Sequence, residues 1–255
     1  MKRIAIIGSG ISGIGAAYAL KDTADVTLFE AQDRLGGHAC THVFDYDGHE
    51  TAVDLGFIVY NGLNYPNLIG LFDALDVETQ ESDMSFAVSD RDGWEWASTA
   101  RGIFAQKRNL FSLDFHRFWR TILKFNDLAR AELAAGRIED TTLGDWLDFH
   151  GFLDYPARSF FQFFENHRLM HKERPQWRTV TGGSQSYVNA AAAELGDRVR
   201  TGTPAIRVFP FGDKITVVTE DNRSHIFDDV ILATHSDQAL RLVEKGFEDQ
   251  SFLLR

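Results

Sequence analysis

Apolar residues at the start of the chain form short runs separated by a glycine-rich stretch. The run over 3–7 ends at a glycine and is typical of a strand buried on both faces. Residues 11–20 are rich in alanine, isoleucine and leucine, which predicts a helix packed closely on a sheet. Residues 26–29 form a second strand-like run that ends at Glu30. This order of strand, glycine turn, helix and strand predicts a βαβ unit.

The pattern changes between residues 66 and 177, where phenylalanine and tryptophan are dense and helical spacing returns. A polar turn between two short apolar runs predicts a hairpin over 86–96. The helices expected in this part span 66–75, 111–135, 142–149 and 157–170. Basic residues lie among the aromatic residues of 104–125, an arrangement that suits an anionic membrane surface or an acyl substrate. We favour the simpler interpretation, an apolar core face with solvated charges opposite.

Short alternating runs return after Pro175. The pattern predicts a helix over 185–195, a helix over 237–245, and strands over 205–209, 214–219, 225–227 and 230–234. The last of these strands is apolar throughout, as in a central parallel strand. We therefore expect an α/β fold with a Rossmann-like dinucleotide-binding domain split in sequence into 1–65 and 178–255. Residues 66–177 are expected to form a helical, aromatic-rich inserted domain.

Charge and cysteine content narrow the range of partners and compartments. The formal net charge of −11 disfavours binding to nucleic acids. Cys40 is the only cysteine, so no intrachain disulfide can form, which fits a reducing compartment. The basic start resembles a secretory signal, but Gly8 and Gly10 interrupt the apolar run. No stretch reaches the length of a membrane-spanning helix without charges, so we expect a soluble, cytoplasmic protein.

The glycine turn has the spacing of a dinucleotide-binding site. Gly8, Gly10 and Gly13 fit the pattern G-x-G-x-x-G, which combines a tight turn, close approach to a pyrophosphate and close helix packing. The following helix directs free N–H groups and its positive dipole end at phosphates. Glu30 ends the second strand, where a carboxylate accepts hydrogen bonds from ribose hydroxyls and disfavours a 2′-phosphate. We place Ser12, in the same turn, with these cofactor-binding residues.

Residues 34–38, Arg-Leu-Gly-Gly-His, follow shortly after this acidic residue. The segment resembles the second signature, R-x-G-G-R, of FAD-dependent flavoproteins similar to amine oxidases, protoporphyrinogen oxidase and phytoene desaturases. The resemblance implies that the cofactor is FAD, with Arg34, Gly36 and Gly37 along its pyrophosphate and ribityl chain. His38 stands where the family has a second arginine, and we include it in the site.

Three further segments resemble parts of the same family. Residues 54–57 resemble its D-x-G segment, which passes near the flavin ring. Residues 203–205 resemble the segment whose backbone holds the adenine, and residues 230–234 resemble a late strand beside the cofactor. The resemblance adds these residues to the expected FAD site: Ala31, Gly56, Phe57, Ala205 and Thr234.

Histidine and cysteine side chains in the same loop offer a different kind of site. His38, Cys40 and His42 are close enough in sequence to bind zinc or copper, and His49 is near. These residues lie in the loop expected to run along FAD, and Cys40 fits the role of a small packing residue. We therefore expect no metal site.

The resemblance implies a flavin-dependent oxidoreductase of the amine oxidase type. The expected reaction is oxidation or desaturation of an apolar or amine substrate by hydride transfer to the flavin. The most similar bacterial amine oxidase-like proteins, described as NAD/FAD-binding, include some associated with modification of unsaturated fatty acyl chains, which implies a lipid-like substrate. The parts that this family uses beyond its second nucleotide-binding segment have no counterpart in the sequence. No residue stands out as acting directly in the chemistry.

Two alternatives stay open at this point. A catalytically incomplete FAD- or nucleotide-binding remnant would need a partner chain to complete its sheet, and its exposed edge would favour association, including a homo-oligomer. An NAD-dependent dehydrogenase would use the glycine turn but leave the Arg-Leu-Gly-Gly segment without a role. Flavin bands in the visible spectrum of the purified protein would separate these alternatives from the flavoenzyme.

Overall fold

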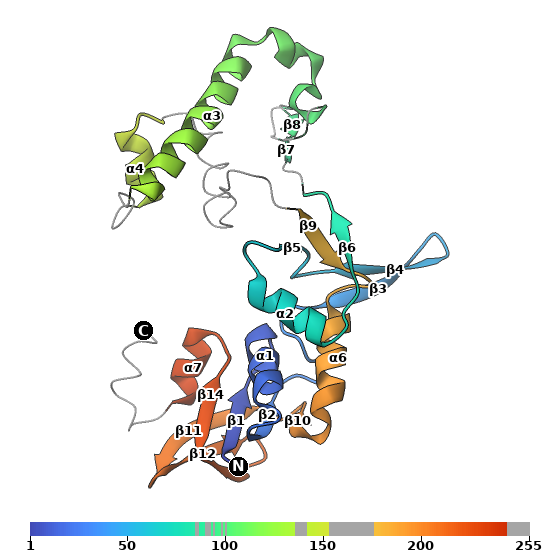
Figure 1. Cartoon of the computed structure of the whole chain (residues 1–255), viewed down its shortest axis with the longest axis vertical. Coiled ribbons are helices and arrows are strands. Elements are labelled where there is room, and N and C mark those ends of the chain that lie inside the picture. Colours follow the sequence, from blue (N-terminus) through green and yellow to red (C-terminus); the bar gives the residue numbers. More distant parts are fainter. Residues whose placement is uncertain are drawn as a thin grey trace. The chain divides into compact units, whose positions relative to one another are not determined.

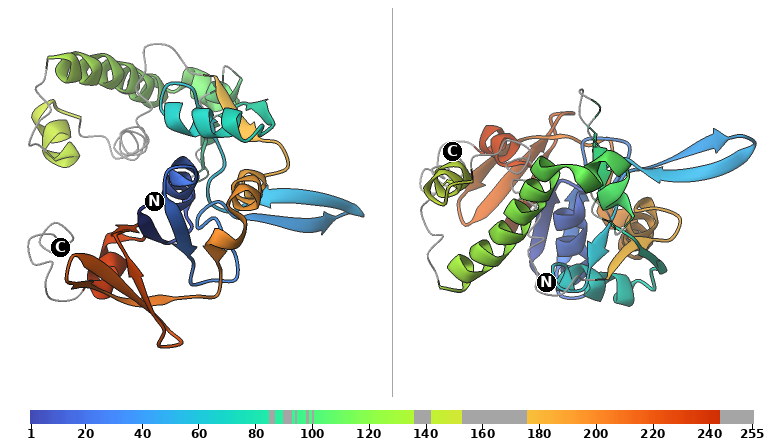
Figure 2. Two further views of the ribbon diagram at one scale, coloured as in Figure 1. Left: turned by 60° about the horizontal axis from the view of Figure 1, so that its bottom comes forward. Right: turned by 90° about the horizontal axis from the view of Figure 1, so that it is seen from above.

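The computed structural model describes residues 1–84, 87–89, 93, 95–97, 99, 101–135, 142–152 and 176–243. The chain divides into two compact units, which are described separately. The first unit combines Met1–Ser82 with Trp177–Arg255, and the second unit spans Asp83–Gln176. The helix expected over 157–170 lies outside the described residues. Figures 1 and 2 show the helices and strands of each unit.

The first unit contains both helices and strands. Its strands are β1 (Arg3–Ile7), β2 (Asp25–Phe29), β3 (Thr41–Tyr46), β4 (His49–Asp54), β5 (Tyr60–Asn61), β6 (Thr79–Ser82), β9 (Trp177–Val180), β10 (Val199–Arg200), β11 (Ala205–Phe211), β12 (Lys214–Thr219), β13 (Ser224–Phe227) and β14 (Asp229–Leu232). Its helices are α1 (Ile11–Leu20), α2 (Pro66–Ala74), α6 (Gln185–Leu195), α7 (Ser236–Leu242) and the short 3₁₀ helix η3 (Gly196–Arg198). The mixed α/β composition agrees with the expected fold class.

A parallel sheet organises the first unit (Figure 1). Its described strands follow the order β10-β2-β1-β14, and β1 pairs in parallel with both neighbours. Ile6 lies opposite Leu28 on one side and Ile231 on the other. The side chains of Ile6 and Leu28 are fully buried. The apolar runs thus become strands covered on both faces, as their sequence predicts.

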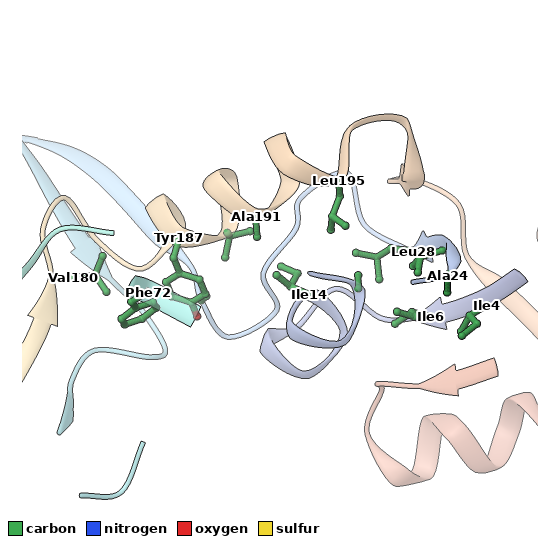
Figure 3. Packing of buried hydrophobic residues seen from close by; sticks show 14 of the residues in the cluster. Ile4, Ile6, Ile14, Ala24, Leu28, Phe72, Val180, Tyr187, Ala191 and Leu195 are labelled. Atoms are coloured by element: carbon green, nitrogen blue, oxygen red, sulfur yellow. The ribbon is translucent and has the colours of Figure 1, made fainter. Parts of the chain in front are cut away.

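Helices α1 and α6 contribute to one hydrophobic core with this sheet (Figure 3). Ile14 of α1 and Ala191 and Leu195 of α6 belong to the same buried cluster as Ile6 and Leu28. The helices expected over 11–20 and 185–195 are therefore present, and their apolar faces cover the sheet. Their close packing fixes the loops that leave the carboxyl ends of the strands.

The first unit extends to Ser82, beyond the domain boundary expected at residue 65. The ring of Phe72 on α2 lies 5.2 Å from that of Tyr60 and 5.0 Å from that of Tyr187, measured between centroids. Strand β6 pairs antiparallel with β9. These contacts tie the segment after residue 65 into the first core, which spacing along the sequence does not reveal.

Strands β3 and β4 form a hairpin that was not among the predicted elements. Asp47 and Gly48 have φ values of 53° and 80° at its turn, the backbone that matches the twist of paired strands. Both views in Figure 2 show the ribbon extending away from the rest of the first unit. Tyr46 is 77% exposed near its tip. Asp47 and Gly48 lie between two runs of alternating residues, and this sequence pattern predicts a hairpin.

The second unit is mainly helical. Its described elements are β7 (Ala87–Ser89), β8 (Glu95–Ala97), the 3₁₀ helices η1 (Gly102–Phe104) and η2 (Lys107–Phe111), α3 (Leu113–Ala134) and α4 (Leu143–Phe149). Phe115, Phe118 and Phe125 of α3 are buried, whereas Arg117 and Lys124 on the same helix are exposed. The core-face interpretation is confirmed for α3.

The buried aromatic face begins later in the chain than the pattern over 104–125 suggested. Phe111 is 90% exposed at the end of η2, so it is not part of the buried face. The reason is local, because the chain forms a 3₁₀ helix there and α3 begins only at Leu113. Periodicity alone had extended the helix to residue 111.

Candidate functional site

A pocket of about 1010 Å³ lies within the first unit. Its walls come from the segments that follow β1, β2 and β14, together with the loop over 34–39 and residues of α6 and α7. The carboxyl ends of parallel strands are the usual ligand-binding edge of an open α/β sheet. The volume is in the range of sites for large organic ligands.

The three glycines of the turn after β1 have different surroundings. Gly8 has φ of 100°, and a Cβ atom there would lie 2.7 Å from the carbonyl oxygen of Ala233. A Cβ atom on Gly13 would lie 1.8 Å from the carbonyl oxygen of Gly8. At Gly10, by contrast, no atom of the described residues lies within 4 Å of such a Cβ. Two glycines are therefore required by packing, and Gly10 leaves open space toward the pocket that it lines.

Helix α1 begins at this open space. Gly10 is its N-cap residue, and the amide of Ile14 makes the first helical hydrogen bond, to the Gly10 carbonyl oxygen at 3.0 Å. Within the described residues, no side chain caps the helix and its first turn holds no acidic residue. The first amides of a helix have no partner inside the helix and attract anions. Ser12 of the same turn lines the pocket.

Glu30 lines the pocket just beyond β2. One carboxylate oxygen accepts hydrogen bonds from the Ser9 amide at 2.9 Å and the Ser9 hydroxyl at 2.5 Å. The other oxygen accepts one from the Gln32 amide at 2.9 Å. A carboxylate has about four acceptor positions, so these three bonds fix Glu30 and leave about one position for a hydroxyl group of a ligand.

Arg34 shapes the loop that follows. Its guanidinium group donates hydrogen bonds to the carbonyl oxygens of Leu35 at 3.1 Å, Gly37 at 2.9 Å and Ala39 at 3.1 Å. The guanidinium thus binds the backbone of its own loop. Arg34 also lines the pocket, so the same side chain supports the wall that it belongs to.

Gly36 and Gly37 bring this loop against the glycine turn. The Gly36 amide donates to the carbonyl oxygen of Ser9 at 3.1 Å. Gly36 has φ of 108°, and a Cβ atom there would lie 2.5 Å from the carbonyl oxygen of Ala39. Gly37 has φ of 58°, and its Cβ would lie 3.2 Å from the Cα of Gly10. Only glycines permit both the backbone conformation and this close approach.

Phe57 joins the same wall from the segment after β4, and Gly56 before it packs against the loop that contains His38. A Cβ atom on Gly56 would lie 2.2 Å from the carbonyl oxygen of His38, and the Phe57 amide donates to that oxygen at 3.0 Å. The Phe57 ring lies 6.2 Å from that of Tyr65 in an edge-on arrangement. Both rings line the pocket, which gives it an apolar section.

Asp54 holds the start of α6 in place. Its carboxylate accepts hydrogen bonds from the Ser184 amide at 2.9 Å, the Ser184 hydroxyl at 2.7 Å and the Thr41 hydroxyl at 2.5 Å. The Thr41 hydroxyl oxygen accepts one from the Gln185 amide at 2.9 Å. Tyr187 follows in the first turn of α6 and lines the pocket. Burial, with a smaller effect of Asp54, raises the pKa of Tyr187 to about 12, so its hydroxyl keeps its proton at neutral pH.

Most of the residues predicted from the sequence meet in this pocket. The predicted residues that line it are Gly8, Gly10, Ser12, Glu30, Ala31, Arg34, Gly36, Gly37, His38, Phe57, Ala205 and Thr234. Gly13 and Gly56 are outside the lining and instead allow close backbone contacts beneath it.

Several lining residues were missed by the sequence analysis. They include Ser9, Gln32, Tyr65, Leu68, Tyr187, His235, Gln238 and Arg241. Ser9 and His235 directly adjoin predicted residues, so their position at the strand ends is a usable signal. Tyr187 lies on a helix far away in sequence, and no local motif marks it.

Metal binding and membrane spanning were considered for the described part of the chain. There, no three or more histidine, cysteine or acidic side chains are grouped to hold a metal ion. His38 lies near a second pocket residue instead, with its ring centroid 5.9 Å from that of His235. Among the helices of the same described residues, none is both long and apolar enough to cross a membrane.

A family model described as flavin containing amine oxidoreductase matches residues 11–252. The flavin-containing amine oxidase of Oncorhynchus mykiss is 25% identical over 269 aligned positions, which cover 91% of this chain and 49% of that protein. The match thus extends through both units and is not confined to the glycine turn.

Two solved structures are similar in fold. Cyclohexylamine oxidase from Brevibacterium oxydans IH-35A has a TM-score of 0.73 and 21% identity, covering 99% of this chain and 62% of its own. A CLA-producing fatty acid isomerase from P. acnes has a TM-score of 0.63 and 16% identity, covering 98% of this chain and 63% of its own. The chain spans less than two thirds of the length of each of these relatives.

Proposed function

This chain belongs to the flavin-containing amine oxidoreductase family, and from that premise we propose that it binds FAD in the pocket of the first unit and oxidises an amine. The observation that carries the proposal is the open space at Gly10, enclosed by two glycine loops in backbone contact. Bound FAD would supply the acceptor for the hydride that leaves the substrate. The protein's own residues would bind and orient the cofactor and keep water out.

The pocket residues fit a dinucleotide of this kind. The amides at the start of α1 and the backbone of Gly10 would contact the diphosphate. The carboxylate of Glu30 would accept a hydrogen bond from a ribose hydroxyl at its remaining acceptor position. Phe57 and Tyr65 would lie against an apolar part of the ligand.

We propose a different role for each of the two units. We assign FAD binding to the first unit, which joins the segments predicted as 1–65 and 178–255 with the residues up to Ser82, and substrate binding to the rest of the inserted segment predicted as 66–177. The pocket supports the first assignment because all of its lining residues belong to the first unit. Exposed apolar side chains of the second unit, Phe111, Leu123 and Phe149, support an apolar substrate surface there.

Gly10→Ala tests the proposal directly. Its added Cβ meets no described atom within 4 Å, so the fold should tolerate it, but the methyl group would occupy the space for the diphosphate. We expect FAD affinity, measured by quenching of flavin fluorescence, to fall about tenfold or more. Gly15→Ala is the matched control, since its Cβ also has free space but Gly15 does not line the pocket.

The visible spectrum of the purified protein decides whether a flavin is bound at all. Flavin bands, or uptake of added FAD, are the expected result. A folded protein that takes up NAD but no FAD would instead support the dehydrogenase alternative. Equal FAD affinity of Gly10→Ala and Gly15→Ala would contradict binding of the diphosphate at the glycine turn.

Substrate class is the second question. Similarity in fold to a fatty acid isomerase favours a lipid-like substrate as the second candidate. Anaerobic mixing of the FAD-loaded protein with primary amines should bleach the flavin bands. Bleaching or isomerisation with unsaturated fatty acids alone would favour the lipid-like candidate. Bound FAD that no substrate reduces would favour the catalytically incomplete alternative, and association measured by sedimentation would then identify a partner requirement.

A further inference from the structure

We propose that His38 and His235 together bind the diphosphate of the cofactor through their imidazolium forms. The inference deepens the proposed function and rests on FAD binding in the pocket of the first unit. The observation behind it is a pair of histidine rings with centroids 5.9 Å apart, both in the pocket lining.

The backbone brings both histidines to the glycine turn. His38 follows Gly37, whose Cβ would lie 3.2 Å from the Cα of Gly10. His235 follows Thr234, whose Cγ2 would lie 3.3 Å from a Cβ on Gly8. Two segments almost two hundred residues apart thus bring the backbones next to both histidines to the glycine turn that precedes α1, and both histidines line the pocket there. This helix end is where an anionic group is favoured.

The guanidinium groups that line the pocket already have hydrogen-bond partners. The guanidinium of Arg34 donates to three carbonyl oxygens of its own loop. The guanidinium of Arg241 pairs with Asp237 at 2.6 Å. Glu30 adds a carboxylate to the same lining. Further cations would strengthen the binding of a diphosphate beyond the partial charge of the helix end, and the two imidazoles lie in the same pocket lining.

Such a contact makes cofactor affinity depend on pH. An anion within a few ångströms favours the protonated form of histidine, so FAD binding takes up protons. Histidine is the side chain that titrates near pH 6.5. The other ionisable groups lining the pocket are carboxylate, guanidinium and phenol groups, which titrate outside pH 6 to 8 as classes. Affinity for FAD should therefore rise as the pH falls from 8 to 6.

The test measures the dissociation constant of FAD with the whole chain at pH 6 and pH 8, by quenching of flavin fluorescence. Wild-type protein should bind FAD about tenfold more tightly at pH 6, the change that corresponds to a shift of one pKa unit. His38→Asn and His235→Asn should each reduce this ratio. His38→Arg keeps a positive charge at both values, so it should tighten binding at pH 8. His49→Asn is the control, because this exposed residue of β4 does not line the pocket.

The results that would contradict the role of the histidines differ from those that would contradict FAD binding. Equal affinity of the wild type at both pH values, or an unchanged ratio in both asparagine variants with native thermal unfolding midpoints, would overturn the role of the histidines while FAD binding stands. Absence of FAD binding at either pH would overturn the proposed function and this inference with it. Weaker binding by His38→Arg than by His38→Asn at pH 8 would show that the position needs shape rather than charge, and would also overturn the inference.

Discussion

The two units are filled by opposite kinds of residue. In the first unit, small residues such as Gly13, Ala17 and Ala191 let helices and loops approach the sheet, and three of its loops touch through glycine backbones. In the second unit, large rings fill the core, with the Phe125 and Trp146 centroids 5.6 Å apart. The first unit should therefore be sensitive to added atoms and the second to removed ones. This difference places the proposed cofactor site where the backbone, rather than the side chains, sets the geometry.

Removal of a ring from the second unit should have the largest effect. Phe125→Ala leaves a cavity among buried aromatic residues, so it should lower the free energy of unfolding of this unit by about 4 kcal/mol. Denaturation followed by tryptophan fluorescence measures the change. Phe111→Ala is the control, because Phe111 is 90% exposed and should change stability by less than about 0.5 kcal/mol. A comparable loss in both variants would contradict the assignment of the core.

Addition of one methyl group to the first unit comes next. Gly13→Ala places a Cβ 1.8 Å from the Gly8 carbonyl oxygen, so α1 must move away from the loop. We expect the free energy of unfolding to fall by about 3 kcal/mol. Gly15→Ala lies in the same helix with free space around its Cβ, and it should instead raise stability by about 0.5 to 1 kcal/mol. Equal effects of the two substitutions would show that the close contact is not rigid.

Loss of the carboxylate under α6 should have an intermediate effect. Asp54→Asn weakens the hydrogen bonds from Ser184 and Thr41, at a cost of about 2 kcal/mol in the free energy of unfolding. It also removes the negative charge that adds to the raised pKa of Tyr187. Spectrophotometric titration should find this pKa lower than in the wild type yet still above the ordinary value, since burial is the larger cause. If the pKa of Tyr187 were the same in Asp54→Asn as in the wild type, the charge of Asp54 would have no effect on this pKa.

The smallest effect is expected at a part-buried ion pair. Lys214 and the backbone amide of Arg3 bond to Asp228 and lower the pKa of its carboxyl group below the ordinary 3.8. A lowered pKa means that the stabilisation is present above the pKa of the unfolded chain and is lost as the pH falls through the folded-state value. Asp228→Asn should therefore lower the unfolding midpoint at pH 7 but match the wild type at about pH 2. A difference that persists in acid would indicate a cause other than charge.

Local patterns in the sequence predicted much of the first unit. Gly8, Gly10 and Glu30 are found at the carboxyl ends of β1 and β2 because a run of apolar residues followed by glycine has few other outcomes. Arg34 shows the limit of such reasoning. It lines the pocket, but its guanidinium bonds to carbonyl oxygens of its own loop. Side-chain partners depend on how the loop folds, which spacing does not encode.

Residues contributed by distant segments could not be predicted. Tyr187 enters the pocket because α6 packs on α1 and because Asp54 holds its first turn. The segment after residue 65 joins the first unit through Phe72 and the β6–β9 pairing. These arrangements are set by tertiary contacts between elements that are each ordinary in sequence. Local signals that were overlooked are the Asp-Gly turn at Asp47 and the positions of Ser9 and His235 directly after strand ends.

The pairing of β1 with β14 has a consequence for how the protein is made. Ile4 lies opposite Asp229, so one edge of the central strand has no partner until nearly the whole described chain has been synthesised. About 200 residues separate β2 from β14, which at ribosomal speed is a delay of roughly 10 to 40 seconds. During this interval an apolar strand edge is exposed in the nascent chain, a template for wrong pairing. Slower translation should therefore increase the fraction of newly made protein that depends on chaperones.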